Sequence, residues 1–402
     1  MAVRIDADVL IPGRGEPLEH GSVLLDGPVI TRVGPTASAP TVDTDPVEVA
    51  AVLPGLWEAH AHFLGLQTAD IHESLHVPVA RMAARATNDI EATLLGGVTS
   101  AREVGGFGVD LAPAVDDGAL PGPTVYGAGD VLSTTGGHGD GHAFPLDVIQ
   151  RSPGWLGHLC DGVPACLRAV RIQLRRGARV IKICASGGVM SEIDDPIHQQ
   201  FSDEEIAAIV SEAARADRVV AAHCHGKPGI MAALRNGVHT IEHGTYLDEE
   251  AADLMRQQGA VLVPTRFVVE LLQEKADTLP AYAHRKAVAI ADRHAMAMKI
   301  AVASGVTIAM GTDIFFAGEY GRNSTEIRHL VDAGLSPLEA IEAATATGPL
   351  TLGPQGPRSG RLEVGYDADV IALDANPLDD LSVWGDPARV THVWKAGNVV
   401  KG

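Results

Sequence analysis

The chain has 402 residues, of which 46% are hydrophobic, and this length is enough for one large core and a small second domain. The formal net charge of −20 disfavours nucleic acid and anionic membranes as partners, and no apolar run approaches the roughly 18 residues of a membrane-spanning helix. The four cysteines lack the spacing of a disulfide framework and the first residues lack a signal-peptide pattern, so we expect a cytoplasmic protein.

Short, strand-like runs separated by turn residues occupy both ends of the chain. They cover residues 3–10, 22–25 and 29–33 at one end and residues 369–373, 390–394 and 398–400 at the other. We predict that residues 1–52 and 358–402 together form one small β-sandwich domain. An N-terminal domain with a separate C-terminal tail is the alternative.

The middle of the chain alternates short apolar runs with longer segments of helical period, such as 203–216, 323–333 and 337–347. The apolar runs are 52–62, 98–104, 124–131, 178–185, 219–223, 239–243, 260–264 and 307–312. Repeated βα units of this number predict an α/β fold, a (β/α)8 TIM barrel over residues 53–357. The active site of such a barrel lies at the carboxyl ends of its strands.

Polar residues stand at these strand ends. The first run ends in His60 and His62, which point to the same side because residues two apart in a strand do so. Two such histidines alone are more often ordinary surface or core residues than ligands. Later runs, however, end in further candidates in the order Lys182, His223, His243 and Asp313. Chance explains six polar groups in these positions poorly, so a metal site is favoured.

This order of residues resembles the amidohydrolase superfamily of metal-dependent hydrolases, and the resemblance covers nearly the whole chain. The motifs at 54–56, 101–106, 135–139, 186–190, 241–245 and 365–369 are similar to those of its prolidase-like branch. That branch contains Xaa-Pro dipeptidases, carboxypeptidases, and enzymes that cleave N-acyl amino acids and mycotoxin amides. One departure is that Trp57 and Glu58 stand where the family usually has an aliphatic residue and an aspartate.

The resemblance implies a centre of two divalent metal ions. His60, His62 and Asp313 would hold one ion, His223 and His243 the other, and Lys182 would bridge them as a carboxylated lysine. For Lys182, binding of a substrate carboxylate is the alternative. Zinc is the expected metal, with manganese, cobalt and iron left open. Asp313 is expected to act as the catalytic base and then as the acid.

The substrate side of the site is less sharply indicated. The resemblance implies that His138 is catalytic or binds substrate, and that Tyr246 binds a carboxylate. Arg266 is a second candidate for the carboxylate, because a guanidinium pairs with it through two hydrogen bonds. Phe315 and Phe316 could line an apolar pocket, with simple packing as the alternative. We expect His225 behind the ligands, because a helix is predicted to begin near it.

The sequence therefore predicts a hydrolase that cleaves an amide or peptide bond next to a C-terminal residue of a small molecule or peptide. Hydrolysis of cyclic amides or N-acyl amino acids is an alternative. A second alternative is the processing of a precursor peptide in natural-product biosynthesis, as by bottromycin-type amidohydrolases. Lys182 disfavours a deaminase, and the intact ligand set disfavours a non-enzymatic scaffold. The resemblance also allows a homo-oligomer.

Overall fold

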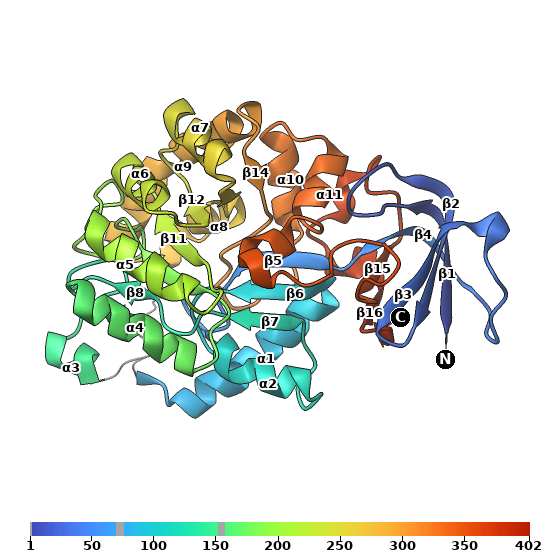
Figure 1. Ribbon diagram of the computed structural model, residues 1–402, viewed down its shortest axis with the longest axis horizontal. Coiled ribbons are helices and arrows are strands. Elements are labelled where there is room, and N and C mark those ends of the chain that lie inside the picture. The colour runs from blue at the N-terminus through green and yellow to red at the C-terminus, as the bar shows by residue number, and fades with distance from the viewer. Residues whose placement is uncertain (1, 70–75, 152–156) are drawn as a thin grey trace.

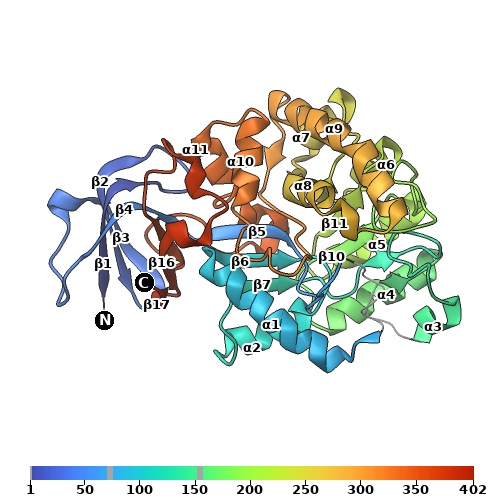
Figure 2. The same ribbon diagram turned by 180° about the vertical axis from the view of Figure 1, so that it is seen from behind.

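A computed structural model describes residues 2–69, 76–151 and 157–402, and it places a barrel surrounded by helices beside a separate β-sheet (Figure 1). Both chain ends lie in that sheet (Figure 2). This arrangement confirms the predicted fold class, an α/β barrel with a β-structure built from the two chain ends. Among the described residues, no helix is both long enough and apolar enough to span a membrane.

The two chain ends form one mixed sheet of seven strands in the order β17-β16-β15-β4-β1-β2-β3. Strand β4 joins the two ends, because it pairs in parallel with β1 on one side and antiparallel with β15 on the other. Alternating apolar side chains such as Ile5, Val23 and Trp394 form the core of the sheet. The domain boundaries at 52 and 358 stay a prediction. The strands are β1 Val3–Leu10, β2 Leu18–Asp26, β3 Val29–Pro35, β4 Val47–Pro54, β15 Val370–Leu373, β16 Val390–Lys395 and β17 Asn398–Lys401.

Eight parallel strands form the barrel, and each coincides with one of the predicted apolar runs. Backbone hydrogen bonds connect the three-stranded and seven-stranded parts of the ring, and among them the N–H of Asp313 donates to the carbonyl of His60 (2.9 Å). The N–H of Arg179 donates to the carbonyl of Gly127 (2.8 Å), and the N–H of Ala59 donates to that of Met310 (2.9 Å). The barrel strands are β5 Leu56–Ala61, β6 Val98–Glu103, β7 Thr124–Gly127, β10 Ile181–Cys184, β11 Val220–Cys224, β12 Thr240–His243, β13 Val261–Val263 and β14 Thr307–Ile308.

Helices cover the outside of the barrel, and two short strands, β8 Leu132–Ser133 and β9 His158–Leu159, extend the sheet beside β10. Helices α5 and α11 begin with a capping box, in which Ser202 and Ser336 exchange hydrogen bonds with a glutamate three residues later. The helices are α1 Val79–Leu95, α2 Gly108–Asp116, α3 Leu146–Arg151, α4 Val163–Arg175, α5 Asp203–Ala214, α6 Lys227–Arg235, α7 Glu249–Gln258, α8 Arg266–Glu274, α9 Ala281–Ala303, α10 Thr325–Asp332 and α11 Pro337–Ala343.

The first predicted run, 52–62, is divided between the two parts of the molecule. Strand β4 ends at Pro54 in the terminal sheet, and β5 begins at Leu56 in the barrel. Gly55 stands at the corner, where a Cβ atom would lie 2.1 Å from Oγ1 of Thr99. Only glycine fits there, so the chain can leave the sheet and enter the barrel within one residue.

Candidate metal centre

The first group of candidate ligands consists of His60, His62 and Asp313. Oδ1 of Asp313 lies 3.2 Å from Nε2 of His62 and 3.6 Å from Nε2 of His60. One ligand atom from each residue lies within 4.8 Å of the others. Asp313 has a left-handed backbone (φ 57°), which aspartate tolerates better than most residues. The three side chains that the sequence assigns to one ion are therefore brought together.

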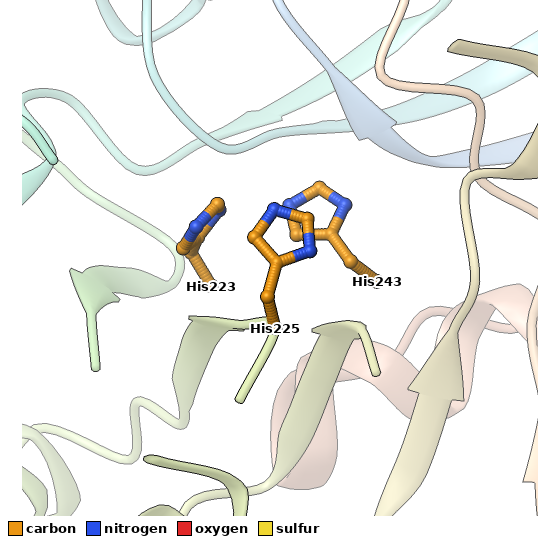
Figure 3. A group of neighbouring side chains, drawn as sticks. All are labelled: His223, His225 and His243. Atoms are coloured by element: carbon orange, nitrogen blue, oxygen red, sulfur yellow. The ribbon is translucent and has the colours of Figure 1, made fainter. Parts of the chain in front are cut away.

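The second group consists of His223 and His225 at the end of β11 and His243 at the end of β12, and Figure 3 shows their rings gathered above the strand ends. The ring centres of His223 and His243 are 4.6 Å apart, and those of His225 and His243 are 4.9 Å apart. From sequence, His225 is expected behind the ligands. In the structure it stands beside them, and its spacing of two from His223, the same as in the pair His60 and His62, is the signal that indicates this position.

Acceptor groups behind three of the rings determine which nitrogen faces the centre. Nδ1 of His60 lies 2.7 Å from the carboxylate of Glu242, and Nδ1 of His62 lies 2.6 Å from the carbonyl of Gly105. Because carboxylate and carbonyl oxygens only accept, these nitrogens carry the proton and leave Nε2 free. His223 is the opposite case, since its Nε2 lies 3.1 Å from the carbonyl of Gly187 and Nδ1 remains free.

Lys182 lies near the end of β10, and its Nζ is 3.3 Å from Nε2 of His60. Burial lowers the pKa of Lys182, because the ammonium form loses its hydration in this site. The neutral amine is therefore favoured more than in water. This is the form that can react with carbon dioxide, so the position and the environment both suit the predicted bridging role.

His60 and His225 are held as neutral imidazoles. Burial and the nearby Lys182 lower the pKa of His60 to about 4, and burial beside His138 lowers the pKa of His225 to about 3. Burial opposes ionisation of Asp313, but its contacts with His60 and His62 outweigh this effect and lower the pKa of that carboxyl. Neutral imidazoles and an ionised carboxylate are the protonation states in which these groups bind metal ions. The donor set therefore fits two divalent ions of the zinc, manganese, cobalt or iron type.

A cavity of about 180 Å³ opens above both groups. His138 lines it, with its ring stacked on that of His223 at 4.2 Å and its Nδ1 2.8 Å from the hydroxyl of Ser191. Phe315 also lines the cavity, where it belongs to an apolar part of the wall. This part contains Leu64, Val189, Met190, Val268, Val269, Leu272, Ile290 and Phe315.

Three other predicted substrate residues are not part of the cavity wall formed by residues 2–69, 76–151 and 157–402. Phe316 stacks on Phe315, with ring centres 4.4 Å apart. The ring of Tyr246 faces the guanidinium of Arg293 at 5.8 Å, and Nη1 of Arg266 donates to the carbonyl of Ala291 (2.7 Å). Both polar side chains are thus directed to α9 or its neighbourhood rather than to the cavity.

The amidohydrolase family model matches residues 51–400 of the chain. The chain belongs to the amidohydrolase family. This amidohydrolase is 44% identical in sequence to ochratoxinase of Aspergillus niger, and the alignment covers 99% of this chain and 86% of ochratoxinase. The crystal structure of A. niger ochratoxinase superimposes with a TM-score of 0.93 and covers 100% of this chain and 96% of the ochratoxinase chain. A prolidase complexed with N-methylphosphonate-L-proline has 34% identity and a TM-score of 0.92, and both chains are covered completely. A Xaa-Pro dipeptidase with bound methionine has 31% identity and a TM-score of 0.89, again with complete coverage.

Proposed function

We propose that this amidohydrolase cleaves the amide bond that joins an acyl group to a C-terminal amino acid with a large apolar side chain. The observation that carries the proposal is the cavity itself, in which both ligand groups share one space with an apolar wall from α8, α9 and Phe315. Membership of the family supports hydrolysis of a C–N bond. The apolar wall supports a substrate with a substantial hydrophobic part.

Each residue of the centre has a proposed task. His60, His62 and Asp313 would hold one ion, His223 and His243 would hold the other, and His225 would add an imidazole to the second group. The neutral amine of Lys182 would add carbon dioxide and release a proton, and the resulting carboxylated lysine would offer its oxygens to the ions. When bound, the two ions would lower the pKa of a water between them toward about 7 and polarise the scissile carbonyl.

Asp313 takes the proton of the attacking water and then donates it to the departing amine, so one carboxylate serves as base and as acid. His138 lies over the second group and contacts the acyl oxygen or the carboxylate of the substrate. Ser191 orients the His138 ring by its hydrogen bond to Nδ1. The apolar wall excludes water from the side of the cavity next to these groups.

The names of the relatives support the substrate class. One relative is an ochratoxinase, one is a prolidase crystallised with a proline derivative, and one is a Xaa-Pro dipeptidase that binds methionine. The shared element is an amide next to a C-terminal amino acid. Cyclic amides and precursor peptides of natural-product pathways stay alternatives, which longer and cyclic substrates test.

The decisive experiment combines metal analysis with a substrate panel. The panel contains N-acetyl-phenylalanine, N-acetyl-alanine, ochratoxin A, Xaa-Pro dipeptides, a cyclic imide and a peptide of about ten residues, a length well beyond what the cavity can enclose. We expect about two equivalents of metal and preferred cleavage of the N-acyl-phenylalanine bond, lost by a factor of at least about 10² in Asp313→Asn. Asparagine keeps the left-handed backbone at this position. Cleavage of only the long peptide would reject the proposal in favour of precursor processing.

A further inference from the structure

A buried arginine lies beneath the metal centre. Arg102 belongs to β6, whereas the two ligand groups draw on β5, β11, β12 and the segment after β14. Its Nε donates to the carbonyl of Ala59 (2.6 Å), its Nη1 donates to the hydroxyl of Thr240 (2.8 Å), and its Nη2 donates to both carboxylate oxygens of Glu242 (2.7 and 2.8 Å). Arg102, Thr240 and Glu242 all have an exposed fraction of 0%.

Glu242 connects this arginine to both ligand groups. Its Oε2 lies 2.7 Å from Nδ1 of His60, a member of the first group, and its neighbour in the chain is His243, a member of the second. The side chains of Glu242 and His243 point in different directions, because adjacent strand residues face opposite sides and His243 has a left-handed backbone (φ 70°). One short segment therefore contacts the first group and supplies a member of the second. Arg102, Glu242 and His60 thus form a continuous chain of contacts from β6 to the centre.

An ion pair in this place is costly unless it has a task. The barrel interior also contains an apolar layer of Ala59, Val261, Val263 and Ala309, so aliphatic side chains pack well at this depth. Buried ion pairs are often no more stabilising than aliphatic residues of the same size. Here each donor of Arg102 that is named above meets an acceptor. The Glu242 carboxylate, which accepts from Arg102, also contacts the candidate ligand His60.

We propose that Arg102 and Glu242 are positioning residues of the metal centre, which fix His60 with its proton on Nδ1 and its Nε2 toward the ion. This inference rests on the proposed function, because it assumes that His60 holds a metal ion. The Glu242 carboxylate accepts only, so it rejects the other tautomer of His60. Arg102 orients that carboxylate through its fork of two hydrogen bonds to the oxygens.

The experiment measures zinc affinity of metal-free protein by competition with a chromophoric chelator, in the wild type, Glu242→Gln and the double variant Arg102→Met/Glu242→Gln. The double variant leaves no unpaired buried charge, so it remains informative if Glu242→Gln does not fold, and circular dichroism checks its structure. The matched control is Glu212→Gln. Glu212 is a largely buried glutamate on α5 that pairs with Arg171 on α4 (2.7 Å) and lies outside the described cavity wall.

We expect one of the two zinc equivalents to bind about 10–100 times more weakly in both Glu242 variants, with the other equivalent unchanged, as for the loss of a residue that orients a ligand histidine. Glu212→Gln should bind both ions like the wild type. Equal weakening of both ions, or wild-type affinity in the folded double variant, overturns the positioning role. A wild type that binds no zinc, manganese, cobalt or iron instead overturns the proposed function, and the two failures are thereby distinguished.

Discussion

The hydroxyl of Thr265 lies 2.7 Å from Nδ1 of His243, although Thr265 occupies the N-cap position of α8. Within the described chain, Thr265 gives α8 no side-chain capping hydrogen bond. The carboxylate of Glu326, on α10, replaces it by accepting from the backbone N–H groups of Arg266 (2.8 Å) and Phe267 (2.7 Å). The helix that carries Leu272 into the cavity is therefore held by two groups, one in the metal centre and one in a neighbouring helix.

Glu326 should make the stability of the protein depend on pH. Burial raises its pKa from 4.5 to about 8, against the two backbone hydrogen bonds that favour the charged form. The folded protein therefore binds this proton more tightly than the unfolded chain. The stabilisation is complete below pH 4.5 and is lost as the pH rises to about 8. We expect Glu326→Gln to lower Tm at pH 5 and to reduce the fall of Tm between pH 5 and 9.

A suitable control for Glu326 is Glu339→Gln. Hydrogen bonds to Ser336 lower the pKa of Glu339 in its capping box, so its stabilisation is lost at acid pH and not at alkaline pH. Differential scanning fluorimetry over the pH series measures both variants. If the Glu326→Gln profile runs parallel to that of the wild type at every pH, Glu326 does not titrate in this window.

His225 should contribute to metal binding. Its ring lies 4.6 Å from that of His223 and 4.9 Å from that of His243, and loss of a group from such a cluster is expected to weaken zinc binding by at least about tenfold. The variant His225→Asn tests this by zinc titration of the metal-free protein. His239→Asn is the matched control. His239 lies just before the first residue of β12, at the end of the strand away from His243, and its Nε2 hydrogen-bonds to the carbonyl of Leu350 (2.8 Å). Normal zinc affinity with a raised KM would instead assign His225 to the substrate.

Leu272 should select for large apolar side chains. It lines the cavity, whereas Leu271, its buried neighbour on α8, is not among the described wall residues. Leu272→Ala removes apolar contact with the substrate, so kcat/KM for N-acetyl-phenylalanine should fall about tenfold and that for N-acetyl-alanine should change little. Leu271→Ala should lower Tm but leave the ratio of the two substrates unchanged. A constant ratio in Leu272→Ala would place the amino acid side chain elsewhere.

Metal removal should destabilise the folded protein. An ion that binds only the folded state and is present at 100 times its Kd contributes about 2.7 kcal/mol. Dialysis against a chelator should therefore lower Tm, and added zinc should restore it. The double variant His60→Ala/His223→Ala, which removes one member of each group, should show no such response. Unchanged Tm in a wild type shown by elemental analysis to lose two metal ions would contradict the expectation.

The strands and most of the candidate ligands could be predicted from sequence because both depend on local spacing. A strand of alternating side chains fixes which face His60 and His62 occupy, and the place of Asp313 after an apolar run puts it at the same end of the barrel. His225 could have been predicted in the same way, from its spacing of two from His223. The helix expected to begin near His225 does begin there, at Lys227 after the N-cap residue Gly226, and His225 nevertheless lies beside His223 and His243.

The contacts of Tyr246, Arg266 and Arg102 could not be predicted in this way. The first two are directed toward α9, a helix that arrives later in the chain, and no local pattern reveals which side chains that helix attracts. Arg102 and Glu242 are 140 residues apart and belong to strands that are not neighbours in the sheets. They meet only because the barrel closes and brings its interior side chains together across the ring.

The position of β4 between β1 and β15 has a consequence for biosynthesis. Strands β1–β4 leave the ribosome before β15, the partner on the other side of β4, which lies more than 300 residues later in the chain. Until β15 is made, β4 is an open edge with unpaired backbone groups, and such edges invite pairing with other chains. The nascent chain must therefore avoid pairing with other chains at this edge until the barrel has been translated.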